Sequence, residues 1–299
     1  MNFGFSGKLS ILIREVLTMK GKIITEEILS AFHKKLIEEE KAAATVEKYL
    51  RDVKAFAEYA NGGEISKDTV IAYKAYLTEG SYAPRSINSM LASLHKLFDV
   101  LGWTDYKVKT VKIQRQVFCS EEKELTKAEY TRLCKTAERK HNERLLLILQ
   151  TICGTGIRVS ELQFITAEAV RRGEATVSLK GKMRSIFIVR NLQKKLLRYI
   201  SVQKIESGAV FVTRTGKPMS RTNIWREMKS LCLDAGVRPE KVFPHNLRHL
   251  FARVFYGIER DIAKLADILG HSSIETTRTY IISSGSEHRR LMETMRLVI

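Results

Sequence analysis

The chain has 299 residues, enough for two domains that each have a core of their own. Its hydrophobic content is 44% and it holds only four prolines, which favours a compact and mostly helical protein. The formal net charge is +18, well above the magnitude of about 2–8 that solubility asks of a small domain. This excess indicates a polyanionic partner, with nucleic acid ahead of an anionic membrane surface and ordinary solubility charge as the plainer alternative.

The sequence predicts no membrane association, because no apolar run is long enough to cross a bilayer. Arg14 and Glu15 interrupt an apolar patch within residues 1–21, which we treat as an N-terminal leader and not as a signal peptide. Met19 is an alternative start to Met1. The four cysteines have neither C-x-x-C nor zinc-like spacing, which favours reduced thiols in a cytoplasmic protein and predicts no metal site.

The first predicted domain covers residues 22–112 and is helical. Apolar residues recur there every three or four positions, with breaks at Gly62-Gly63 and around Gly80. This spacing predicts four helices, at 26–39, 45–59, 67–77 and 85–101.

The periodicity fails after this domain, where basic residues alternate with Val and Ile. We therefore predict an extended basic linker at 113–124. A strap over a DNA backbone and a merely solvated linker are both consistent with this pattern. The cations that could contact DNA in and before this linker are Lys107, Lys109, Lys112 and Arg115.

The second predicted domain covers residues 125–299. Thr126 and Glu129 form a capping box that predicts a helix start, and a further helix is expected at 142–153. Alternating apolar and polar residues on both sides of Lys180-Gly181-Lys182 predict a β-hairpin, after which helices dominate. The predicted fold class is mainly α with a small β-sheet, in two domains.

His245 and Arg248 are three positions apart, so on a helix they lie on one face. Pro244 suits the first helical turn, where free N–H groups favour a phosphate. An arginine fork matches two phosphate oxygens. The pair therefore predicts a cradle for a phosphodiester, with a surface histidine and arginine as the plainer alternative.

Four further residues are candidates for the same site: Arg158, Lys180, His271 and Tyr280. Gly270 is expected to end a helix, which places His271 in a tight corner, and Ser272 is expected to cap the next helix. Tyr280 follows about two turns later, as a nucleophile or as a half-buried core tyrosine.

Arg158 follows a glycine corner and either faces a ligand or pairs with Glu161. Lys180 stands at the hairpin turn, where its long side chain either reaches into a groove or is simply exposed.

Three segments resemble known active-site motifs in their order and spacing. They are 154–162 (GTGIRVSEL), 245–249 (HNLRH) and 269–271 (LGH), with Tyr280 nine positions after the last histidine. They are similar to the active-site motifs of the tyrosine recombinases, also called phage-type integrases. The resemblance is strong over residues 126–280. It is weaker in the first domain, which looks like the helical, SAM-like core-binding domain of that family.

The resemblance implies an active site that cleaves DNA with a tyrosine. The roles carried over are a phosphate clamp (Arg158 and Arg248), a base or orienting group (His245), a donor to a non-bridging oxygen (His271), an acid for the leaving 5′ oxygen (Lys180), a nucleophile (Tyr280) and a supporting acidic group (Glu161). The hairpin is shorter than the commonest family pattern, so Lys182 is the alternative to Lys180 and is otherwise a candidate DNA contact.

The implied function is site-specific recombination through a 3′-phosphotyrosyl intermediate, in DNA integration and excision or in resolution. It implies no cofactor or metal, double-stranded DNA as the partner, a homotetramer on paired sites and a bacterial cytoplasmic location near the nucleoid. It also allows an accessory DNA-bending or directionality factor. The alternatives are a type IB topoisomerase-like enzyme and a non-catalytic DNA-binding protein on the same fold.

The end of the chain carries a last signal. Leu291, Met295 and Val298 fall on one face of a short helix, which is marginal alone in water and must dock on something. The resemblance favours docking on a neighbouring protomer, and docking on its own domain is the alternative.

Overall fold

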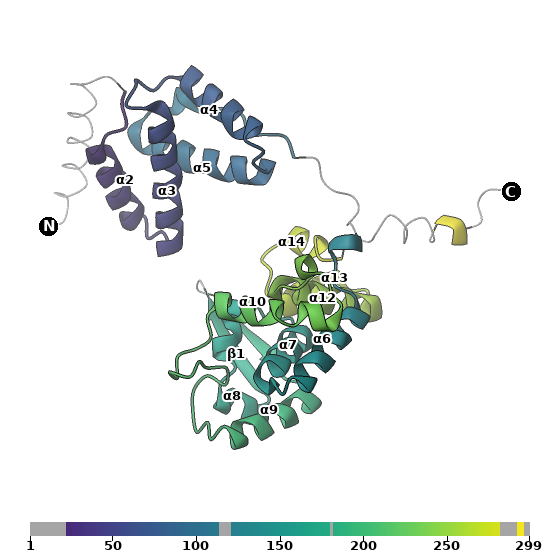
Figure 1. Cartoon of the computed structure of the whole chain (residues 1–299). Helices are drawn as coiled ribbons and strands as arrows, with labels where there is room; N and C mark the ends of the chain where they lie inside the picture. Colours follow the sequence, from purple (N-terminus) through teal and green to yellow (C-terminus); the bar gives the residue numbers. More distant parts are fainter. Residues whose placement is uncertain (1–21, 114–120, 180–181, 282–291, 296–299) are drawn as a thin grey trace. The chain divides into compact units, whose positions relative to one another are not determined.

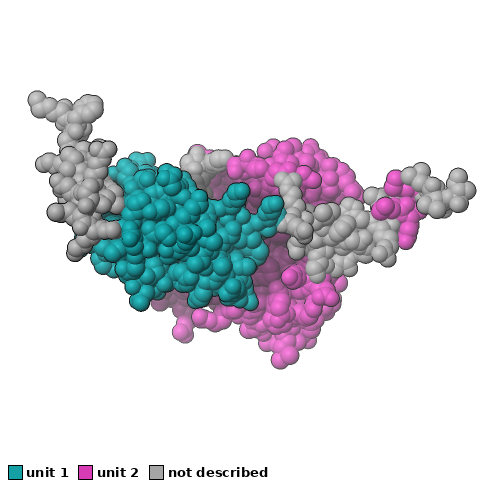
Figure 2. All heavy atoms as spheres, turned by 90° about the horizontal axis from the view of Figure 1, so that it is seen from above, with its two compact units in different colours: residues 1–115 teal, residues 116–299 magenta. Residues whose placement is uncertain are grey.

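The computed structural model describes residues 22–113, 121–179, 182–281 and 292–295 (Figure 1). The chain divides into two compact units, residues 1–115 and 116–299 (Figure 2). Each unit has its own hydrophobic core and is described by itself. The mainly helical fold with one small sheet, predicted from the sequence, is confirmed.

The described part of unit 1, residues 22–113, holds four α-helices and a short 3-10 helix. The helices close on one aromatic-rich core, in which the Phe56 and Tyr73 rings lie 5.0 Å apart. The predicted helical spacing is confirmed in all four cases, with ends that differ from the predicted ones by only a few residues. The elements are α2 (Glu26–Glu38), α3 (Ala43–Ala60), α4 (Lys67–Glu79), α5 (Pro84–Leu101) and η1 (Thr104–Tyr106).

The segment after η1 lies against unit 1. Asn88 on α5 holds it through two bonds, because its amide nitrogen donates to Val111 O (2.9 Å) and its amide oxygen accepts from Val111 N (2.7 Å). The side chains of Val108 and Val111 pack on the core of this unit. The beginning of the basic stretch is therefore held in place by its own domain.

Unit 2 is helical around one antiparallel hairpin. Strands β1 and β2 pair in register from Glu174 with Phe187 to Leu179 with Lys182. The elements are η2 (Glu121–Lys123), α6 (Lys127–Arg139), α7 (Glu143–Thr155), η3 (Val159–Phe164), α8 (Ala167–Arg172), β1 (Glu174–Leu179), β2 (Lys182–Phe187), α9 (Arg190–Val202), α10 (Arg221–Lys229), α11 (Cys232–Ala235), η4 (Pro239–Lys241), α12 (Pro244–Glu259), α13 (Ile262–Leu269) and α14 (Ile274–Arg278).

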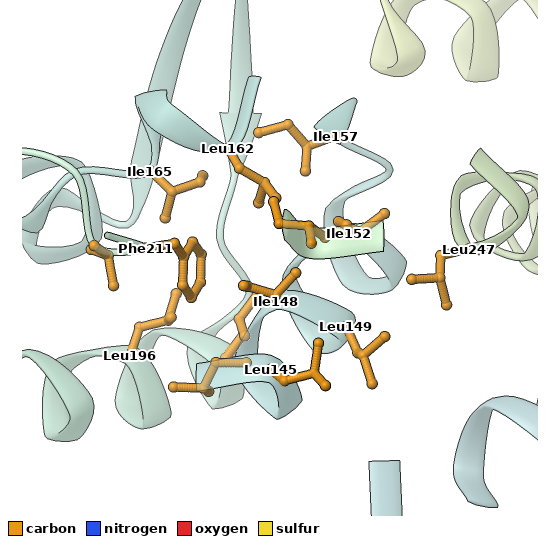
Figure 3. Packing of buried hydrophobic residues seen from close by; sticks show 14 of the residues in the cluster. Leu145, Ile148, Leu149, Ile152, Ile157, Leu162, Ile165, Leu196, Phe211 and Leu247 are labelled. Carbon is orange, nitrogen blue, oxygen red and sulfur yellow. The ribbon is translucent and has the colours of Figure 1, made fainter. Parts of the chain in front are cut away.

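Helix α7 forms the centre of this unit. Its sequence is apolar on several faces, and Leu145, Ile148 and Ile152 are all fully buried (Figure 3). A helix that is apolar nearly all round must be covered by neighbours on every side. Helices α6, α9 and α12 supply that cover, so the helix that carries His245 and Arg248 rests directly on the core.

Three local predictions have clear outcomes. The capping box of Thr126 and Glu129 is present at the start of α6. Gly270 ends α13 with φ 64°, a left-handed conformation that glycine adopts without strain. The prediction that Ser272 caps the next helix is wrong, because Ser273 is the residue whose side chain accepts from Glu275 N. Among the described residues, no helix is long and apolar enough to span a membrane.

Candidate active site

The C-terminal end of α13 organises the site. The last carbonyl groups of a helix lack intrahelical partners and form the negative end of the helix dipole. Here the carbonyls of residues 268–270 each accept a hydrogen bond from a different arginine. Arg184 on β2 donates to the first, Arg248 Nη2 on α12 to the second at 2.7 Å, and Arg158 Nη2 to the third at 3.3 Å.

One carboxylate links two of these arginines. Glu161 is buried, and its two oxygens accept from Arg158 Nη1 (2.8 Å), from Arg158 N (2.9 Å) and from Arg184 Nη2 (2.5 Å). Burial alone would raise the pKa of Glu161, but these bonds and the nearby positive charges hold that pKa below its usual value. Two guanidinium groups thus share one carboxylate, and with Arg248 nearby the site keeps a surplus of positive charge.

Arg248 is the most deeply buried of the three, with 1% of its surface exposed. Its Nη1 donates to Gly156 O at 2.6 Å, and its Nη2 also lies 2.9 Å from His271 Nε2. Burial and then the charge of Arg158 lower its pKa to about 10, so it stays charged at neutral pH. Its Nε is buried and, among the described residues, has no hydrogen-bond partner.

His271 is held from both ring nitrogens. A guanidinium can only donate, so Nε2 accepts from Arg248 and Nδ1 carries the hydrogen. That hydrogen is donated to the hydroxyl of the buried Thr277, 2.9 Å away. Burial and then the charges of Arg248 and Arg158 lower the pKa of His271 to about 4, so the ring is neutral at pH 7.

Tyr280, two residues past the end of α14, is buried and surrounded by imidazole rings. Its ring stacks on His249 at 4.2 Å and lies 5.0 Å from His271 and 5.2 Å from His245. The Arg248 guanidinium carbon is 5.9 Å from the ring centre. Tyr280 is therefore buried as a core residue would be, but among the rings and charges of the candidate site.

His245 lies in the first turn of α12 with its side chain exposed. Packing of the ring against its neighbours, and then the charges of Arg248 and Arg158, lower its pKa. A neutral imidazole beside a tyrosine can accept a proton.

Two hollows flank Arg158. One, of about 560 Å³, is also lined by His245 and Arg248 and by Arg221 and Trp225 of α10. The other, of about 660 Å³, lies beside Glu161, Arg184 and His271. Arg158 thus separates two open spaces, one towards α10 and one towards the hairpin.

The other predicted site residues belong to unit 1, to the hairpin or to segments outside the described residues. Lys180 and Arg115 lie outside the described residues, and Lys182 is the first residue of β2, paired with Leu179. On unit 1, Lys107 bonds to Asp99 at 2.5 Å, whereas Lys109 and Lys112 are exposed.

The sequence reasoning did not single out Arg184, His249 or Thr277. A signal for Arg184 was present, because it shares the face of β2 on which Ile186 is buried. An arginine at an inward position of a strand needs a buried partner. The stacking of His249 on Tyr280 had no comparable signal, since these residues lie on different elements.

Comparison with known proteins assigns both units. Residues 123–287 match the model of the phage integrase family, and residues 29–104 match its N-terminal SAM-like domain. The chain is 28% identical over 282 residues to tyrosine recombinase XerA of Thermococcus kodakarensis, which covers 91% of this chain and 96% of that protein. It is also 28% identical over 266 residues to tyrosine recombinase XerD of Xanthomonas campestris, covering 81% and 82%.

Solved structures show the same fold. The XerH recombinase bound to its difH substrate in a pre-cleavage complex aligns with a TM-score of 0.67 and 17% identity, over 97% of this chain and 94% of that one. A lambda integrase from a tetramer bound to a Holliday junction aligns with a TM-score of 0.68 and 19% identity, over 85% and 76%. Because one family model covers more than half of the sequence, the chain belongs to the phage integrase family.

Proposed function

We propose that this protein is a site-specific recombinase that breaks and rejoins DNA strands through a 3′-phosphotyrosyl intermediate, with Tyr280 as the nucleophile. The observation that carries the proposal is the placement of Tyr280 among three histidines and beside the buried arginine cluster. A phenol beside charges that can hold a phosphate suits phosphoryl transfer, which depends on positioning and charge stabilisation.

The phosphate is bound by Arg158 and Arg248, aided by His271. The surplus positive charge favours the phosphodiester, and Arg158 and Arg248 line the same cavity as His245. His271 accepts from Arg248 in the free protein. An anionic phosphate between these two groups raises the pKa of the imidazole and lets it donate to a non-bridging oxygen.

The covalent step moves two protons. The Tyr280 oxygen attacks phosphorus while its proton passes to the neutral His245, and the bond from phosphorus to the 5′ oxygen breaks. The leaving oxygen takes a proton from Lys180, with Lys182 as the alternative donor. The phosphotyrosyl bond conserves the energy of the phosphodiester, so attack by a 5′ hydroxyl reseals the strand without ATP.

Double-stranded DNA is the substrate in this proposal. Arg221 and Trp225 open onto the cavity beside Arg158, and Lys229 lies 5.2 Å over the Trp225 ring, so α10 presents cations and an aromatic surface next to the site. The net charge of +18 agrees with a polyanionic partner. The structural neighbours bound to difH DNA and, as a tetramer, to a Holliday junction support a homotetramer on paired sites.

Trapping the covalent intermediate tests the proposal. A duplex selected by the wild-type protein from a randomised library, then nicked beside the cleavage position, should accumulate a protein–DNA adduct on a denaturing gel. Tyr280→Phe should bind this duplex in a gel shift as the wild type does and form no adduct, because only the nucleophilic oxygen is removed. An adduct formed by the Phe variant would show that another residue is the nucleophile.

A further inference from the structure

We propose that Arg184 is a positioning residue for DNA cleavage. From strand β2 it aligns Glu161, and through Glu161 the clamp arginine Arg158, and it anchors the hairpin that carries Lys180 and Lys182. The inference rests on the proposed function and extends it to a residue outside the phosphate clamp.

The hydrogen bonds of Arg184 are made to other groups of the protein. Its Nη2 donates to Glu161 Oε2 at 2.5 Å, and its Nη1 donates to Ile268 O. Only 13% of its side chain is exposed, and within the described part of the chain its Nε has no partner. Both Nη atoms are thus hydrogen-bonded to protein groups. Arg184 therefore acts through its neighbours.

The corner before His271 is built against Arg184. Gly270 has φ 64°, and a Cβ added to it would lie 2.5 Å from Arg184 Cδ and 2.9 Å from Arg184 Nε. The backbone thus runs directly over the side chain of Arg184. This contact, together with the bond to Ile268 O, fixes the strand to the end of α13 from which His271 extends.

Arg184 also holds strand β2 close to its first residue. It pairs with Val177 in the register of the sheet, and Lys182, two residues earlier, closes the ladder with Leu179. Two residues of strand span about 6.6 Å, so the first residue of β2 lies within one pleat repeat of the Arg184 anchor. The bonds of Arg184 to Glu161 and to the α13 terminus therefore connect the phosphate clamp with the strand that begins at Lys182, the alternative acid.

Substitution of Arg184 tests the inference. Arg184→Met keeps the unbranched stem of the side chain and removes its donors and its charge, while Arg184→Lys keeps the charge and loses the fork. Arg198→Met, at an exposed position on α9, is the matched control. Each variant is assayed for binding by gel shift on the selected duplex and for single-turnover adduct formation on its nicked form. Each is also assayed on the same nicked duplex with a 5′-bridging phosphorothiolate.

We expect Arg184→Met to bind the duplex within about threefold of wild type and to form the adduct about 100-fold more slowly, the size of effect that a misplacement of about 1 Å produces. The phosphorothiolate should recover a large part of this loss, because a thiolate leaves without help from an acid. A purely structural role would lower binding and cleavage together and would give the same deficit on both substrates.

Adduct formation by Arg184→Met within about threefold of wild type, or an equal deficit with oxygen and sulfur leaving groups, would overturn the inference. If Arg184→Met does not fold, Arg184→Lys serves as the test. Adduct formation by Arg184→Lys at the wild-type rate would show that the guanidinium fork is not needed, and it would overturn the inference. If the wild-type protein forms no adduct at all, the proposed function fails. A normal wild-type adduct with unaffected Arg184 variants refutes only the role of Arg184.

Discussion

The histidines of the site are neutral because of where they lie. Burial comes first and neighbouring charges second in lowering the pKa of His249 and of His271 to about 4. A neutral imidazole accepts a proton or a hydrogen bond, whereas an imidazolium would repel the arginines around it. The same arginines that prepare the site for a phosphate thus keep these rings uncharged until a phosphate arrives.

This arrangement predicts a loss of stability in mild acid. The two histidines titrate near pH 4 when folded, against an ordinary value of 6.5. Between these values the unfolded chain binds more protons, so the free energy of unfolding should fall as the pH drops from about 6.5 towards 4. Urea unfolding across this range measures the effect. His249→Gln should show a shallower pH dependence, and an unchanged slope would contradict the low pKa of His249.

Two single substitutions identify which lysine, Lys180 or Lys182, protonates the leaving 5′ oxygen. Lys180→Ala should slow adduct formation on the normal nicked duplex, and the 5′-bridging phosphorothiolate should restore it. Lys182→Ala is the matched variant, two residues along the same hairpin. Rescue of Lys182→Ala and not of Lys180→Ala would move the acid role to Lys182.

At the level of elements, the end of α13 carries most of the organisation. One helix terminus accepts from three arginines, one directly before η3, one on β2 and one on α12, and each bond joins residues at least 21 positions apart in the chain. A helix terminus gathers cations well because its carbonyls carry partial negative charge and lack partners. The cluster is therefore held by backbone groups, which no substitution of a side chain removes.

Gly270 is the position at the end of α13 where a substitution should have the clearest effect. Gly270→Ala should cost about 1–2 kcal/mol of unfolding free energy for its left-handed backbone, and it should also slow adduct formation because the new Cβ displaces Arg184. Gly236 is the matched control, since it too has positive φ (58°) but nothing lies within 4 Å of an added Cβ.

Urea unfolding and the adduct assay separate the two effects. Both alanine variants should lose stability, and only Gly270→Ala should lose cleavage. Equal cleavage by the two variants would mean that the contact between Gly270 and Arg184 has no part in the reaction.

At the level of the whole molecule, the remaining prediction is that the end of the chain docks on a second protomer. Met292 and Met295 are 70% and 55% exposed, while Leu291 and Val298 of the predicted stripe lie outside the described residues. If the stripe docks on a second protomer, deletion of residues 290–299 should leave binding of one protomer to a half-site intact. It should weaken cooperative filling of the second half-site and abolish strand exchange.

Gel shifts on half and full sites, paired with a recombination assay, measure this outcome. Normal recombination by the truncated protein would exclude a contact between protomers. Loss of solubility would indicate docking of the tail on its own domain.

The sequence by itself determined the helices, because the spacing of apolar residues and the capping residues act within a few positions of one another. The four helices of unit 1, the capping box at Thr126 and the glycine corner before His271 all follow from such local rules. The order of the three motifs was enough to indicate the family.

Tertiary structure alone decided how the site is held together. Arg184 on β2 bonds to the carboxylate of Glu161, and Tyr280 stacks on His249. These contacts join residues on different elements, whose approach depends on how the helices pack on α7 and not on any local pattern. A buried charge needs a partner, but its sequence position does not say which distant residue supplies one.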